Sequence, residues 1–247
     1  MAINRTYATY SQADAAQIDA GLRQYMLTVY NYMGSALALT GIFAYLTVQF
    51  AVASWAPMQL TAFGQALYLS PLKWVVMLAP IGLVLLFSFR IHAMSFFSAQ
   101  AVFWGYAALM GLSLSSILIV FTGESVARVF FITAATFGAM SLWGYTTKRD
   151  LSGMGSFLIM GLVGIIIASL VNIFLESSAL QFAISVIGVL VFTGLTAYDT
   201  QRIKESYFAH DDSETAGKKA LFGALQLYLD FINLFVMLLQ LFGQQRE

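Results

Sequence analysis

Seven long apolar runs with few charged residues are the feature that most constrains how this chain can fold. An α-helix needs about 20 residues to cross the hydrocarbon core of a bilayer, and the length of each run is near that value. The runs are continuous, whereas the strands of a transmembrane β-barrel alternate between apolar and polar residues. We therefore predict an all-α, polytopic membrane protein with transmembrane segments near residues 26–51, 74–89, 96–121, 127–147, 154–175, 179–198 and 220–243.

The composition of the chain agrees with this class. Hydrophobic residues make up 60% of the 247 residues, charged residues make up 10%, and the mean hydropathy is +0.78. A soluble domain has about a quarter of its residues charged. The length leaves no room for a separate soluble domain, so we expect an N-terminal tail (1–25), a transmembrane domain (26–243) and a short C-terminal tail (244–247). The polar tail lacks the apolar stretch of a cleavable signal, so the first helix is expected to direct insertion.

Several classes of site are excluded by residue type. Cysteine is absent, so the chain has no disulfide, thiol nucleophile or cysteine metal site. His92 and His210 stand alone in the sequence, which argues against a zinc pair. The formal net charge is zero and the basic residues are dispersed, so we expect no nucleic-acid partner. We expect no bound cofactor.

The distribution of Lys and Arg predicts the orientation of the chain, because cytoplasmic loops carry the excess of basic residues. In the seven-segment topology, the side of the N-terminus holds Arg5, Arg23, Arg90, Lys148, Arg149, Arg202, Lys204, Lys218 and Lys219, and the other side holds Lys73, Arg128 and Arg246. The N-terminus is therefore expected in the cytoplasm and the C-terminus outside. A re-entrant last segment with a cytoplasmic C-terminus is an open alternative, because Asp230 interrupts that segment.

Small residues spaced four apart predict close contacts between helices. The sets are Ala107, Gly111 and Ser115; Ala134 and Gly138; and Gly164 and Ala168. We interpret them as structural.

Asp199 and Asp230 lie inside the last two apolar runs. A carboxylate in hydrocarbon costs several kcal/mol, so it persists only if it faces the protein interior, pairs with another group or has a function. Asp230 follows Lys219 by eleven residues, or roughly 16 Å of helix, which places it near the midplane. Asp199 is shallower, and the two reach the same level if the last helix begins near Glu214. Arg90 ends the second run on the same side and can meet them.

Two carboxylates that meet in a low dielectric cannot both ionise cheaply, so they tend to share one proton. The pair would then act as a proton-sensitive latch, and a nearby Arg90 would favour its ionised form. The alternative is purely structural. Asp199 would neutralise Arg202 or Lys204 at the interface, while Asp230 would accept a hydrogen bond from a Tyr or Asn inside the bundle.

Two segments of the chain resemble the signature segments of the Bax inhibitor-1 family. They are Ala197-Tyr198-Asp199-Thr200-Gln201, followed by Ile203-Lys204, and the stretch Leu225–Phe235, which reads Leu-Gln-Leu-Tyr-Leu-Asp-Phe-Ile-Asn-Leu-Phe. The turn Lys148–Ser152 and the helix end Asn172–Phe174 also fit the pattern. The resemblance extends over nearly all seven segments, and the polar N-terminal tail is similar to that of bacterial members.

This resemblance implies a compact seven-helix fold with the last helix near the centre, and a pH-sensitive calcium leak across the membrane, in bacteria the inner membrane. It implies that Asp199 and Asp230 form the proton sensor and that Arg90 bonds to them. We also expect Asp199 and Asp230 to bind calcium transiently. One departure is that some relatives carry a carboxylate within the second helix, whereas the run from Trp74 to Phe89 has none. The expected partners are therefore lipid, protons and calcium.

Two other functions remain open at this stage. A bacterial branch of the family resembles a modulator of a membrane-anchored ATP-dependent protease, and eukaryotic members are tied to suppression of cell death, so the chain can instead be an interaction protein. An intramembrane aspartyl protease also places two aspartates on consecutive helices. Such proteases carry Gly-x-Gly-Asp at the second aspartate, whereas Asp230 follows Leu-Tyr-Leu. We therefore predict that the chain is not an enzyme.

Acidic residues near the segment ends are candidate entrances for cations. Glu124 and Glu176 are expected on the outer side, and Asp211 and Asp212 on the inner side. The acidic cluster around Asp211 and Asp212 lacks the ligand order and central glycine of an EF-hand, so a solvated loop is the simpler interpretation.

Overall fold

The structure is a computed structural model, which describes the backbone of residues 3–246 and the side chains of residues 19–91 and 93–246. Seven of its helices are long and apolar enough to cross a membrane. They are α1 (Ile3–Ala51), α3 (Leu72–Arg90), α4 (Phe96–Val120), α5 (Gly123–Thr146), α6 (Ser152–Leu175), α7 (Ser178–Glu205) and α8 (Ser213–Phe242). This result confirms the predicted all-α membrane fold. Most of the expected N-terminal tail, including Arg5, and the last residue of the C-terminal tail lie outside the described side chains.

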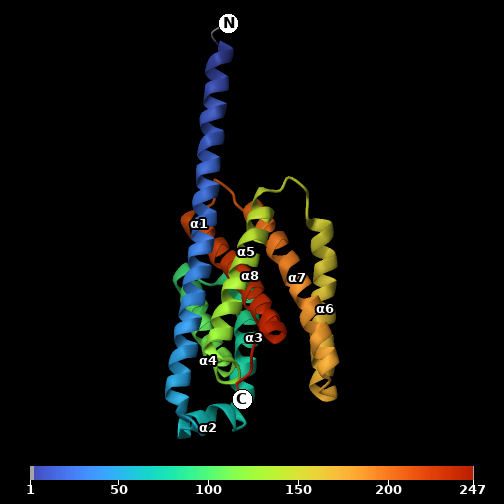
Figure 1. The fold of residues 1–247 in the computed structure, drawn as a ribbon. Helices are drawn as coiled ribbons and strands as arrows, with labels where there is room; N and C mark the ends of the chain where they lie inside the picture. Colours follow the sequence, from blue (N-terminus) through green and yellow to red (C-terminus); the bar gives the residue numbers. More distant parts are fainter. Residues whose placement is uncertain (1–2, 247) are drawn as a thin grey trace.

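The two chain termini lie at opposite ends of the bundle (Figure 1). We call the end where α1 enters the N-side and the opposite end the C-side. The C-terminal tail packs on the C-side, where the Gln244 carbonyl accepts a hydrogen bond of 2.9 Å from Thr122 N–H. The Arg246 guanidinium lies 4.1 Å from the centre of the Trp55 ring. Helix α8 is one continuous helix of 30 residues and is long enough to cross a membrane, which favours a spanning last segment over a re-entrant one.

A small C-side cap between α1 and α3 was not predicted from the sequence. Strands β1 (Val52–Trp55) and β2 (Met58–Leu60) form an antiparallel hairpin, and helix α2 (Ala62–Tyr68) follows. A further short element, the 3₁₀ helix η1 (Ile91–Ala93), connects α3 to α4 on the N-side. Strands of four and three residues are too short to produce a recognisable alternation in the sequence.

Hydroxyl and carboxylate side chains fix where several helices begin. The N-cap side chains of Ser95, Thr122, Ser177 and Asp212 accept backbone N–H groups at the starts of α4, α5, α7 and α8. Such caps satisfy N–H groups that have no partner within the helix. The cap at Asp212 starts α8 one residue before Glu214, so the predicted extension of the last helix is confirmed.

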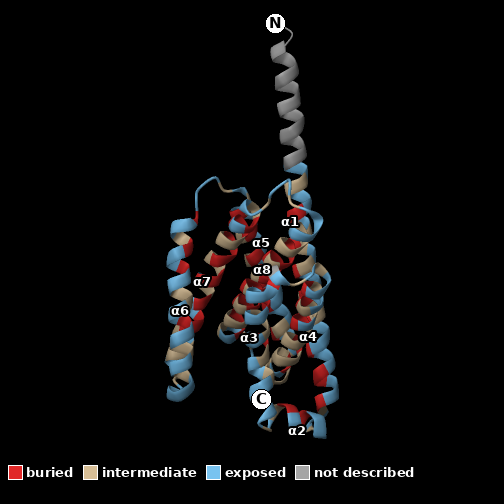
Figure 2. Cartoon of the chain, turned by 180° about the vertical axis from the view of Figure 1, so that it is seen from behind, coloured by how far each residue is buried: buried red, intermediate tan, exposed pale blue. Residues whose placement is uncertain are grey.

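Helix α8 occupies the centre of the bundle. It packs against α1, α4, α5 and α7, and Figure 2 shows buried residues along its length. Helices α3 and α6 lie at the outside, where α3 packs mainly on α4 and α6 on α7. Their outward faces carry exposed apolar residues such as Phe89, Phe157 and Phe174, as expected for surfaces that face lipid. The central position of the last helix is therefore confirmed.

Only some of the small residues that were predicted to lie at helix contacts are buried between helices. Ala107, Gly111 and Ser115 are buried as predicted, and a Cβ atom on Gly111 would crowd the backbone of α1 at Thr40. The same prediction is wrong for Gly138 and Gly164, which are exposed and would leave an added Cβ in open space. Spacing alone does not say which face of a lipid-exposed helix meets a neighbour.

Candidate functional site

The two predicted aspartates come together between α7 and α8. A hydrogen bond joins the carboxyl groups of Asp199 and Asp230. Asp230 is only 4% exposed, and Asp199 is partly buried. The contact arises because α7 and α8 are consecutive, antiparallel and closely packed. Two carboxyl groups can form a hydrogen bond only if one of them carries a proton, so a contact of this kind requires one shared proton.

Some of the polar atoms around Asp230 in the bundle core lack a hydrogen-bond partner among the described residues. Its Oδ2 atom is buried without a hydrogen-bond partner among the described residues, as is the hydroxyl of Tyr106. Tyr228, two residues before Asp230, shares a hydrogen bond of 2.7 Å with Thr40, which donates to the Ala107 carbonyl at 2.9 Å. This chain of bonds joins α8 to α1 and α4 and holds the helix that carries Asp230.

The residues that follow Asp199 in the signature segment hold the connection between α5 and α6. The Gln201 side chain accepts a hydrogen bond of 2.9 Å from Leu151 N–H and donates one of 2.8 Å to the Arg149 carbonyl. The Lys204 ammonium donates to the Tyr145 carbonyl at 2.9 Å. Sequence reasoning did not identify the role of Gln201. The available signal was a second uncharged polar residue next to the aspartate, in a helix that is otherwise mostly apolar.

A row of hydroxyl groups connects α7 to α5 and α1. Tyr30 of α1 shares a hydrogen bond of 2.7 Å with Ser141 of α5, and Ser141 shares one of 2.8 Å with Thr200. Thr200 also donates to the Thr196 carbonyl. These bonds tie α1, α5 and α7 together beside Asp199 and fix the rotation of α7.

Arg90 does not reach the aspartates in this structure. It ends α3 with an exposed side chain, and the ion pairs of the described residues join Glu124 to Arg128, Glu214 to Lys218 and Asp211 to Lys219. Neither of the cations considered for Asp199 pairs with it within the described residues. Lys204 bonds to a carbonyl, and Arg202, one turn further along α7, acts on Asp199 through its charge without forming an ion pair with it. The arginine part of the predicted latch therefore stays a prediction.

The acidic residues at the segment ends are largely occupied by local contacts. On the C-side, Glu124 pairs with Arg128 at 2.8 Å, and Glu176 ends α6 with a positive φ of 49°. On the N-side, Asp211 pairs with Lys219 at 2.6 Å. The backbone N–H of Thr215 bonds to Asp212 and holds the pKa of its carboxyl below the usual value. Among the described residues, no group of three or more His, Asp or Glu side chains is placed to hold a metal ion.

Comparison with known proteins gives a consistent result. The model of the family described as "Inhibitor of apoptosis-promoting Bax1" matches residues 22–247. An uncharacterized protein of Rickettsia prowazekii is 49% identical over 229 residues, which cover 93% of each chain. The inner membrane protein YbhL of Escherichia coli is 48% identical over 92% of this chain and 94% of its own length. A protein of Caulobacter vibrioides is 47% identical over 99% of this chain and 98% of its own length.

The arrangement as a whole is a pair of acids buried between two membrane-spanning helices. It can bind or release a proton, and after release it presents two adjacent carboxylates. Hard divalent cations prefer such oxygen ligands. Nearby bonds from Tyr228 and Gln201 hold the two helices that position the pair.

Proposed function

This chain belongs to the Bax inhibitor-1 family, and on that premise we propose that it is a pH-sensitive calcium leak channel of the bacterial inner membrane. The N-terminus lies in the cytoplasm in this proposal. The hydrogen bond between the carboxyl groups of Asp199 and Asp230 is the observation that carries it. It supports a gate in which proton binding at this pair controls ion passage.

The physical argument is one of charge. While the pair shares a proton, it holds one negative charge, and the two helices can stay in contact. Loss of that proton places two negative charges side by side in a low dielectric, which costs free energy unless a cation or water enters. The buried Oδ2 atom of Asp230 has no hydrogen-bond partner in the described part of the chain, so it is a further oxygen ligand for such a cation.

Opening requires a helix to move. Helix α8 fills the centre of the bundle and packs against four other helices, so ions cannot pass through the centre in this arrangement. A shift of α8 relative to α7 would separate the two carboxyl groups. Small displacements of one packed helix against another are common in proteins that switch between two states. We propose that this arrangement is the closed state.

The sign of the pH dependence distinguishes two versions of the gate. If calcium binds the ionised pair, the leak increases as the pH rises. If the ionised pair instead bonds to Arg90 and so keeps the channel shut, acidification opens it. The exposed position of Arg90 favours the first version.

The test is calcium flux into dye-loaded liposomes that contain the purified protein, from about pH 5 to about pH 8. We would compare the wild type with Asp199→Asn and Asp230→Asn. Asp150→Asn is the matched control, because Asp150 is an exposed aspartate in the N-side connection between α5 and α6. We expect a pH-dependent leak in the wild type and the control, and a flat pH profile in both pair variants.

Two results would contradict the proposal. Unchanged pH profiles in Asp199→Asn and Asp230→Asn would remove the pair as the sensor. Calcium flux no greater than in empty liposomes at every pH would remove the channel itself. The interaction-protein interpretation would then be preferred, and a membrane-anchored ATP-dependent protease would be the first partner to test.

A further inference from the structure

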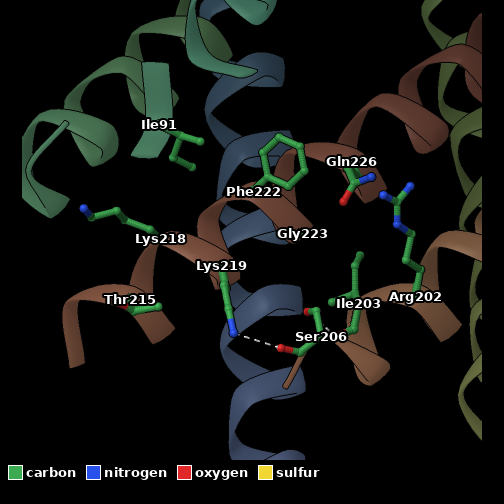
Figure 3. Close-up of a pocket in the computed structure, with 10 residues that line it drawn as sticks. All are labelled: Ile91, Arg202, Ile203, Ser206, Thr215, Lys218, Lys219, Phe222, Gly223 and Gln226. Atoms are coloured by element: carbon green, nitrogen blue, oxygen red, sulfur yellow. Dashed lines mark hydrogen bonds between the residues drawn. The ribbon is translucent and has the colours of Figure 1, made fainter. Parts of the chain in front are cut away.

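A cavity of about 320 Å³ opens on the N-side, between the end of α7 and the first four turns of α8. Figure 3 shows the side chains that line it, with Arg202 and Gln226 on one side and Lys218 on the other. Ile91 of η1 and Phe222 supply part of an apolar wall. The cavity is therefore amphipathic, with cations beside an apolar surface.

The cavity has an excess of positive charge. Arg202, Lys218 and Lys219 line it, and no acidic side chain does so among the described residues. The two lysines have carboxylate partners nearby, since Lys218 lies 2.9 Å from Glu214 and Lys219 lies 2.6 Å from Asp211. Arg202 forms no ion pair within the described side chains, and the carboxyl group of Asp199, one turn away on α7, is close enough to act on its charge. The N-terminal turn of α8 adds the positive end of a helix dipole.

The position of the cavity relative to the aspartate pair follows from helix spacing. Arg202 lies three residues after Asp199 on α7, and Gln226 lies four residues before Asp230 on α8. Residues three or four apart share a helix face and lie about one turn, or roughly 5 Å, apart. The cavity therefore lies next to the pair, on its N-side.

The chemistry of the lining favours an anion with several oxygen atoms. Arginine presents a planar set of donors that matches phosphate oxygens, and lysines add compact positive charges. A free cation would be repelled. The apolar wall at Ile91 and Phe222 suits a ligand that continues into a less polar group.

We propose that this cavity binds the phosphate group of an anionic phosphate ester, with Arg202 as the principal ligand and Lys218 and Lys219 beside it. Two sources carry this group, namely an anionic phospholipid and a soluble phosphate ester. The 30 residues of α8 span about 45 Å, against a hydrocarbon thickness of about 30 Å. The turns that carry Lys218 and Lys219 thus reach the level of the head groups, where basic pockets between helices bind anionic lipids.

The test uses the full chain, purified in detergent and titrated with phosphatidylglycerol or phosphatidylcholine, with bound lipid counted by native mass spectrometry. A second arm titrates inorganic phosphate by calorimetry, with the chain in phosphatidylcholine nanodiscs. We expect Arg202→Gln to weaken phosphatidylglycerol binding about tenfold, because it removes charge-assisted bonds to phosphate. Arg128→Gln is the matched control, since Arg128 is an exposed arginine on the C-side.

Each outcome decides the matter. Loss of phosphatidylglycerol binding in Arg202→Gln and in Lys218→Gln, with Arg128→Gln unchanged, supports the site and the lipid source. Binding of inorganic phosphate with the same dependence on Arg202 supports the site and assigns it to a soluble ester. Equal phosphatidylglycerol binding by all the variants, with no phosphate binding, overturns the proposal. Lys218→Gln is a second, independent variant if Arg202→Gln does not fold. The result is independent of calcium conduction, because no arm measures flux.

Discussion

Gly144 of α5 meets the backbone of α7 at Ala197 so closely that a Cβ atom on Gly144 would overlap the Ala197 carbonyl oxygen. Asp199 follows Ala197 by two residues, so this contact fixes the depth of the helix segment that carries the aspartate. We predict that Gly144→Ala lowers the free energy of unfolding by roughly 1–3 kcal/mol, because neither backbone can yield without a shift. Thermal unfolding of the purified protein in detergent measures the loss.

The matched control lies on the same helix. Gly138 is exposed, and an added Cβ there would meet no neighbour within 4 Å. Gly138→Ala is expected to leave stability unchanged or raise it by roughly 0.5–1 kcal/mol, through the better helix propensity of alanine. Equal losses in the two variants would show that the contact at Ala197 is not the cause.

These two glycines also show what the sequence can and cannot predict. Hydropathy located all seven long helices, because hydrocarbon thickness fixes their length. The two intramembrane aspartates were found because buried charge is costly in lipid. Gly138 was wrongly predicted to face a neighbouring helix. Lipid and a neighbouring helix are both apolar, so the sequence does not distinguish a residue that faces one from a residue that faces the other. The exposed position of Arg90 and the role of Gln201 depend on helix rotation and loop path, which a single sequence does not encode locally.

The bond between Thr40 and Tyr228 provides a second prediction. Thr40→Val removes the hydroxyl that serves Tyr228 and the Ala107 carbonyl. We expect a loss of roughly 1–3 kcal/mol, the cost of leaving buried polar groups unpaired. Tyr228→Phe should cost less, and the double variant should cost less than the sum of the two. A double-mutant cycle of unfolding free energies measures this coupling, and strict additivity would argue that the hydroxyls do not interact.

The cap at the start of α8 gives a prediction about pH. The Thr215 N–H bonds to the Asp212 carboxylate and lowers its pKa in the folded protein. Because the folded pKa is depressed, this stabilisation is present above the unfolded value of about 4 and is lost as the pH falls through the folded value. We therefore expect Asp212→Ala to lower the melting temperature at about pH 7 and to have a progressively smaller effect as the pH falls below about 4.

The control for the cap is Asp212→Asn, because asparagine is also a good N-cap residue. It should keep most of the melting temperature at neutral pH and show a weaker pH dependence than the wild type. A pH-independent loss in Asp212→Ala would attribute the effect to side-chain removal in general rather than to the carboxylate cap.

The last prediction concerns Gln201, which holds the N-side connection between α5 and α6 through Leu151 N–H and the Arg149 carbonyl. Gln201→Leu removes both bonds and leaves the buried Leu151 N–H unpaired, at a cost of roughly 1–3 kcal/mol. The connection contains Lys148 and Arg149, whose exposed side chains are cleavage sites for trypsin. We expect the variant to be cut there several-fold faster, because cleavage requires local opening of the backbone.

Gln100→Leu is the control for this experiment, since its side chain also bonds across helices, to Tyr32 at 2.9 Å, but far from the connection. It should leave the cleavage rate near the wild-type value. If Gln201→Leu is cut no faster than Gln100→Leu, the two bonds of Gln201 do not hold the connection. If it is cut faster and its calcium flux profile also changes, the connection and the aspartate pair are linked through α7, because Gln201 and Asp199 lie two residues apart on that helix.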